Sequence, residues 1–158
     1  MMKKLLLLLF LPLSLSAQVN LDSLWGIWND NTQEDTSRLK AMQKIAWDGY
    51  LFSNPDTAFI LAQQGYDFAK EKGLKKHMAL ALNIQGVSFA IRGQGDSAIL
   101  YWEKCYKIHE EMGNKKGMAA PIGNIGIIYT DQGDNKKALE YYQKALKIQE
   151  EVGHRNRS

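Results

Sequence analysis

Residues 126–153 read GIIYTDQGDNKKALEYYQKALKIQEEVG, a segment with the pattern of two amphipathic helices on either side of a Gly-Asp break. Its small and apolar residues recur at helical spacing on both sides of that break: Gly126, Tyr129, Ala138, Tyr142, Ala145 and Ile148. Two helices with apolar stripes of this kind bury them against each other. The segment therefore predicts a helical hairpin.

The same hairpin recurs upstream at a fixed interval of 40 residues. Glycines at the ends of the second helices and alanines near their starts keep this register: Gly73, Gly113, Gly153, Ala58, Ala98 and Ala138. We expect each of these glycines to end its helix, as a residue that adopts the left-handed conformation readily. Three units in phase predict an all-α solenoid in which each unit contacts mainly its neighbours.

The chain before the repeats holds one further amphipathic segment. Leu21, Leu24, Trp25 and Trp28 follow an i, i+3, i+4, i+7 pattern, which predicts a short helix. We expect this helix to cover the open end of the array, and the alternative is that its tryptophans form an exposed ligand platform. Residues 29–36 are polar and read as a loop.

The predicted organisation follows from these boundaries. The first repeat helix begins at Ser37 and stops near Phe52, because Asn54 and Pro55 have the residue types of an N-cap and a first helical position. The expected parts are a signal peptide at 1–17, a cap helix and loop at 18–36, repeats at 37–73, 74–113 and 114–153, and a tail at 154–158.

The first 17 residues have the three-part layout of a secretory signal peptide. A basic start is followed by an apolar run at residues 5–15 and by small residues at 14–17. The run contains Pro12 and is shorter than the roughly 20 residues that span a bilayer, so we expect no membrane anchor. Cleavage after Ser16 or Ala17 would leave an exported protein, periplasmic or extracellular.

Composition and spacing argue against several functions. The net charge of +3 includes Lys3 and Lys4 of the predicted signal, so the remainder is nearly neutral, unlike a typical nucleic-acid binder. The only cysteine, Cys105, is expected to be a small core residue. The histidines, His77, His109 and His154, lack the spacing of a metal site and are expected at the surface. We therefore expect no catalytic residue, metal or cofactor.

The third unit resembles the tetratricopeptide repeat. The resemblance rests on a pattern of large, glycine, tyrosine and alanine positions: Ile122, Ile125, Gly126, Tyr129, Ala138, Tyr142 and Ala145. The middle unit matches with Gln85 in place of the usual leucine, and the first unit is weaker at Gly49, Ala62 and Gly65. The interval of 40 exceeds the usual 34, so the units look like the long-repeat members of the family.

This resemblance implies a right-handed superhelix that binds proteins or extended peptides along a concave face formed by the first helices. Ten residues are the candidates for that face: Gln43, Trp47, Tyr50, Asn83, Val87, Ala90, Gly123, Ile127, Thr130 and Asp131. Among them Trp47, Val87 and Ile127 step by 40 and form an apolar row. The row either accepts side chains of a ligand or packs helix against helix.

The last repeat helix is followed by only five residues after Gly153. Solenoids generally need a polar element at each end. We therefore expect either that the chain is part of a longer array, or that the exposed face of the last helix docks in a dimer or on a partner. The leading function is an exported, non-catalytic protein-binding scaffold. The alternative is the extracytoplasmic sensory segment of a longer signalling protein, of the histidine kinase or nucleotide cyclase type, and a hydrolase or cell-wall-binding role comes third.

Overall fold

The computed structural model describes residues 20–155, and side chains up to residue 153. The predicted signal peptide at 1–17 lies outside the described residues, as do the last three residues. The described elements are α1 (Leu21–Asn29), α2 (Asp35–Lys44), the π-helix η1 (Ile45–Tyr50), α3 (Pro55–Glu71), α4 (Lys75–Ile91), α5 (Gly95–Glu111), α6 (Lys115–Asp131) and α7 (Asn135–Arg155).

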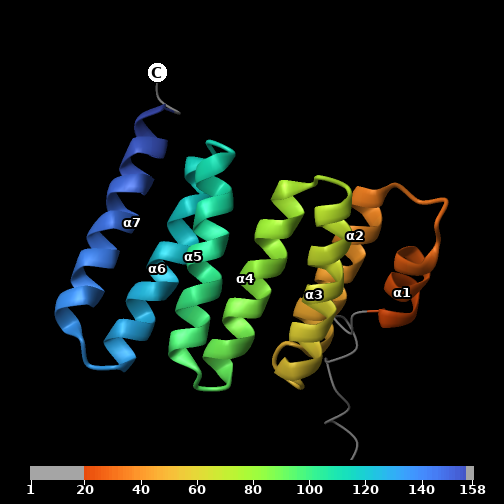
Figure 1. The fold of residues 1–158 in the computed structure, drawn as a ribbon, viewed down its shortest axis with the longest axis horizontal. Helices are drawn as coiled ribbons and strands as arrows, with labels where there is room; N and C mark the ends of the chain where they lie inside the picture. The colour runs from red at the N-terminus through yellow and green to blue at the C-terminus, as the bar shows by residue number, and fades with distance from the viewer. Residues whose placement is uncertain (1–19, 156–158) are drawn as a thin grey trace, which may run out of the picture.

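The helices stand side by side in one row, with α1 at one end and α7 at the other (Figure 1). Successive helices run in opposite directions and form three hairpins: α2 and η1 with α3, α4 with α5, and α6 with α7. This is the predicted all-α solenoid of antiparallel helix pairs. None of the described helices is both long enough and apolar enough to cross a membrane.

Turn chemistry sets the boundaries of most helices. Asn54 caps α3 by accepting a hydrogen bond from the Thr57 amide at 3.0 Å, and Pro55 is the first helical residue, as predicted. Gly73 and Gly113 have φ angles of 67° and 62°, which confirms their role in ending α3 and α5. The chain reverses direction just after each of these two glycines.

Three boundaries differ from the predictions. Gly153 does not end its helix, because α7 continues through it to Arg155. The first repeat helix begins at Asp35 rather than Ser37, so the preceding loop is shorter. After Lys44 that helix continues as the π-helix η1, which the sequence pattern did not predict.

Small residues and rings bring the two helices of a hairpin together. A Cβ atom added to Gly86 on α4 would lie 2.6 Å from the Trp102 indole nitrogen, and one added to Gly126 on α6 would lie 2.7 Å from the Tyr142 ring. The two pairs are 40 residues apart and make the same contact. Trp102 packs on its other side against Ile125 and Ile128 of α6, so it also joins neighbouring hairpins.

Helix α1 covers the first hairpin. Its leucines and tryptophans pack against a buried cluster that includes Met42, Ile45 and Leu61. The tryptophans are partly buried there, which confirms the covering role and contradicts the exposed-platform alternative.

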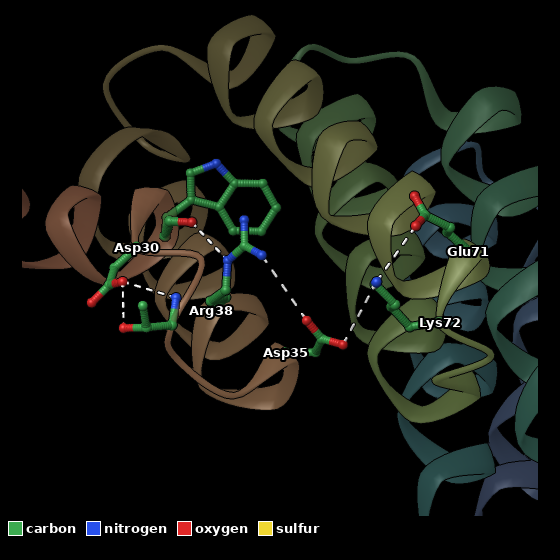
Figure 2. Close-up of polar contacts among 7 residues, drawn as sticks. Asp30, Asp35, Arg38, Glu71 and Lys72 are labelled. Atoms are coloured by element: carbon green, nitrogen blue, oxygen red, sulfur yellow. Dashed lines mark hydrogen bonds and ion pairs between the residues drawn. The ribbon is translucent and has the colours of Figure 1, made fainter.

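Arg38 holds α1 against α2 and α3 (Figure 2). Its Nε donates to the carbonyl oxygen of Trp28 at 2.9 Å. Its guanidinium lies 5.4 Å from the centroid of the Trp28 ring and 4.6 Å from that of Phe68. Figure 2 also shows Asp35 between Arg38 and Lys72, at 4.0 Å and 3.9 Å. One arginine therefore connects three helices.

Polar pairs at the ends of the helices also repeat. Where neighbouring hairpins meet, Arg92 of α4 pairs with Asp56 of α3 at 2.6 Å. At the next junction Gln132 of α6 donates to Asp96 of α5 at 3.0 Å. In both cases a side chain at the C-terminal end of a first helix contacts an aspartate in the first turn of the preceding second helix.

Candidate peptide-binding groove

An open groove of about 410 Å³ lies between α2, η1 and α4. Three of the ten candidate residues line this groove, namely Gln43, Trp47 and Asn83. The remaining lining residues are Lys40, Lys44, Asp48, Leu80 and Ile84. The structure thus brings together the candidates of the first two repeats only in part.

Apolar side chains line the groove from both η1 and α4. Trp47 and Leu80 are each 38% exposed. Phe52 is 75% exposed and meets the Trp47 ring edge-on at a centroid distance of 6.4 Å. Trp47 stands on η1, and π-helical turns often occur at functional sites. The groove therefore offers apolar surface to a ligand.

Hydrogen-bonding and charged groups line the same groove. The amide oxygen of Asn83 accepts from the Trp102 indole N–H at 3.1 Å, so its NH₂ group is free to donate. Lys44 pairs with Asp48 on the same helix. Lys40 is exposed and forms no ion pair within residues 20–153. The groove thus presents an amide donor and one unpaired positive charge.

Gln43 is committed to a protein contact. Its side-chain nitrogen lies 3.1 Å from His77 Nδ1 and 3.4 Å from the His77 carbonyl oxygen. It therefore joins α2 to α4, and a ligand would have to compete for its donors.

Three further candidates lie against the core. Tyr50 packs against the first buried cluster, Ala90 against the second, and Val87 against both. Val87 is partly buried, so it separates Trp47 from Ile127 rather than continuing an exposed row. The apolar row is exposed only at its two ends.

The four candidates of the third repeat lie on α6, away from the groove. Ile127 is 50% exposed and Asp131 is exposed. Gly123 has open space where a side chain would stand. The Thr130 hydroxyl is 3.1 Å from the Tyr142 hydroxyl and donates to the Gly126 carbonyl, so it belongs to the hairpin contact.

Five groove residues were not among the candidates. Lys40 lies three residues before Gln43, and Lys44 lies three before Trp47. Leu80 and Ile84 lie three residues before Asn83 and Val87. Extending the candidate set to its i, i+3 and i+4 neighbours would have included these four residues. Asp48 directly follows Trp47 and gives no such signal.

His77, His109 and Cys105 are not at the surface, and the side chain of His154 lies outside the described part of the chain. His77 and His109 are 7% and 8% exposed, so the prediction that they are surface residues is wrong for both. Burial lowers the pKa of each, and Lys76 and Lys40 lower that of His77 further. Cys105 is buried as predicted, and burial raises its pKa to about 12, which keeps the thiol protonated.

None of these groups forms a reactive cluster. The Cys105 thiol donates to the Ala79 carbonyl at 3.3 Å. Within the described part of the chain, no three potential metal ligands come together.

Comparison with known proteins agrees with the fold. Residues 77–151 match the family model of the tetratricopeptide repeat. The chain is similar to the solved TPR domain of Arabidopsis FLU, with a TM-score of 0.67 and 20% identity over 74% of this chain and 98% of that one. A search of curated proteins finds no match. The likeness shows a solenoid of the tetratricopeptide type.

Proposed function

We propose that this chain is a non-catalytic scaffold that binds an extended protein segment in the groove between α2, η1 and α4. The observation that carries the proposal is the exposure of Trp47 and Leu80 beside the free amide donor of Asn83. Concave sites that combine apolar area with a few oriented polar groups are typical of ligand binding. Tetratricopeptide solenoids, which this fold resembles, are scaffolds of this kind.

The groove favours a peptide with one large apolar side chain. Burial of such a side chain against Trp47 and Leu80 would contribute about 1.5–3 kcal/mol. The Asn83 NH₂ would donate to a carbonyl of the peptide backbone, and Lys40 would favour a neighbouring acidic group. An affinity in the micromolar range fits a groove this small and open.

Random-peptide display on the purified protein tests this proposal. Selected peptides should share an apolar anchor, and Trp47→Ala should weaken their binding about tenfold or more by calorimetry. Ile60→Ser is the matched control, because Ile60 is exposed on α3 and does not line the groove. Failure of the folded protein to select any peptide, or equal binding by Trp47→Ala, would contradict the proposal.

We also propose that the protein works outside the cytoplasm. The support is the signal-like composition of residues 1–17. Cell fractionation with and without these residues tests it, and a protein found only in the cytoplasm in both cases would refute export.

The second candidate is the sensory segment of a longer signalling protein. The observation that favours it is the outer side of α7, which no described helix covers and which further repeats would cover. Reading the coding sequence past Ser158 decides it, because a stop codon there eliminates this candidate.

A further inference from the structure

The outer side of α7 carries an apolar stripe. Leu139, Tyr142 and Leu146 lie at i, i+3 and i+7 and are 57%, 40% and 54% exposed. Tyr142 is held in place, since its ring lies against Gly126 and its hydroxyl is 3.1 Å from that of Thr130. A fixed ring between two exposed leucines is a preformed contact surface.

The helix one repeat earlier shows what covers such a stripe. The equivalent residues on α5 are Ile99, Trp102 and Tyr106, and all three pack against clusters that contain residues of α6. Trp102 is only 3% exposed as a result. The stripe on α7 is therefore of the kind that another helix covers.

Two features of α7 differ from those that seat a following repeat. Asp56 and Asp96 each hold the end of the next first helix, but the equivalent residue on α7 is Lys136. In addition, α7 continues through Gly153, whereas the chain turns back after Gly73 and Gly113. The surface of α7 is thus changed where the next first helix of an array would attach.

Opposite charges flank the stripe at its two ends. Lys136 is three residues before Leu139, and Glu150 is four residues after Leu146, so both lie beside the stripe on the helix surface. Both side chains are exposed, and neither forms an ion pair within the described residues. A helix with a cation at one end and an anion at the other is complementary to an antiparallel copy of itself.

We propose that α7 binds α7 of a second copy of this chain in an antiparallel, two-fold arrangement. The midpoint between Leu139 and Leu146 falls between Tyr142 and Gln143, and that between Lys136 and Glu150 falls at Gln143. With the axis there, each Leu139 faces Leu146 of the second copy. Each Lys136 then faces Glu150 of the second copy, and the two Tyr142 rings meet near the axis.

The charges favour the antiparallel over the parallel arrangement. Parallel helices would place Lys136 beside Lys136 and Glu150 beside Glu150, which is unfavourable at both ends of the stripe. The antiparallel pairing makes two ion pairs and covers both ends. It uses neither the groove nor α1, so the proposal is independent of peptide binding.

Sedimentation equilibrium of the purified full chain tests the association. We expect a concentration-dependent dimer, and Leu139→Ser with Leu146→Ser should yield a monomer that still unfolds cooperatively and still binds groove peptides. Leu100→Ser is the control, because Leu100 is 49% exposed on α5 and lies off the equivalent stripe. A wild-type monomer at all concentrations, or a dimer unaffected by the two serines, overturns the proposal.

Charge exchange tests the antiparallel pairing itself. Lys136→Glu and Glu150→Lys should each weaken the dimer about fivefold or more, and the double variant should restore it. Loss without restoration in the double variant would overturn the pairing.

Cross-linking gives a second measure of the same geometry. Gln143→Cys should form a disulfide-linked dimer under mild oxidation, since two copies of this residue lie near the axis. Glu103→Cys, the equivalent position on α5, should not. Equal cross-linking by both variants would overturn the proposed axis.

Discussion

At the scale of single residues, two glycines on first helices set the spacing within the hairpins. Gly86 and Gly126 each lie against an aromatic ring of the second helix, and a Cβ atom at either position would come within 3 Å of that ring. Contacts this short leave no room for a side chain. The repeated pair of glycine and ring is therefore a packing requirement of the hairpin.

Gly126→Leu should lower the free energy of unfolding by about 1–3 kcal/mol, because the added side chain overpacks the Tyr142 contact. Gly123→Ala on the same helix should instead raise it by up to about 1 kcal/mol, because alanine favours a helix and no atom lies within 4 Å of its Cβ. Urea denaturation of both variants measures the difference. Equal effects would show that the ring does not limit the position.

These residue contacts could be read from the sequence in part. A glycine on the first helix and an aromatic residue on the second that recur at the same interval predict a contact between them, because only a small residue leaves space for a ring. The burial of His77 and His109 could not be predicted, since it depends on amide partners from the helix before or the turn beside each ring. Gln85, fully buried with one bond to Gln63, is a similar case.

At the scale of elements, α1 is the least self-sufficient helix. It has nine residues and none of them is fully buried, so tertiary contacts must hold it. Arg38 supplies several of these contacts at once, with a hydrogen bond to α1 and rings of α1 and α3 beside its guanidinium. The cap therefore depends strongly on one side chain.

Arg38→Ala should lower the free energy of unfolding by about 1–3 kcal/mol, through a lost charged hydrogen bond and lost cation–π contacts. Protease should then cut sooner within residues 30–34. Lys40 lies on the same helix, is exposed and has no ion pair among the described residues, so Lys40→Ala should change stability by less than about 0.5 kcal/mol. Unchanged proteolysis in Arg38→Ala would mean that the apolar residues of α1 suffice.

Most helices can be predicted from local sequence signals, whereas the π-helix η1 cannot and the groove beside it can only in part. Asn54 with Pro55 and the two turn glycines act through their own backbone chemistry, so sequence alone predicts the helices they bound. The π-helix η1 lies where Gly49 meets Leu21 of α1, a contact that a periodic pattern does not contain. The groove is only partly predictable for the same reason, because it lies between α2, η1 and α4.

At the scale of the whole molecule, both junctions between hairpins contain a neutral histidine. The Gly117 amide donates to the Asn114 side-chain oxygen, so the Asn114 nitrogen faces His109 Nδ1, which must accept. Gln43 faces His77 Nδ1 in the same way. Protonation at either Nδ1 would set two donors against each other.

Stability should therefore fall with acidification. The pKa of each histidine is lowered in the folded state. As the pH falls below about 6.5, the ordinary histidine pKa, the unfolded chain therefore binds protons before the folded chain does. The stabilisation is complete above that pH and is lost as pH falls through the folded pKa values. Thermal midpoints from pH 7.5 to 5 measure it. His77→Gln and His109→Gln should each flatten the decline, and an unchanged slope in both would contradict this origin.

The two histidines also restrict how this chain can be rearranged. At the second junction the His109 ring lies against Gly117. The residues 40 positions earlier, at the first junction, are Ala69 and His77. Each junction therefore has one imidazole and one small residue in this pair of positions. A duplicated unit that placed His109 before His77 would bring two imidazoles into one space, while Ala69 before Gly117 would leave that space empty. The repeats are therefore not interchangeable modules, and gene duplication or recombination must preserve their order.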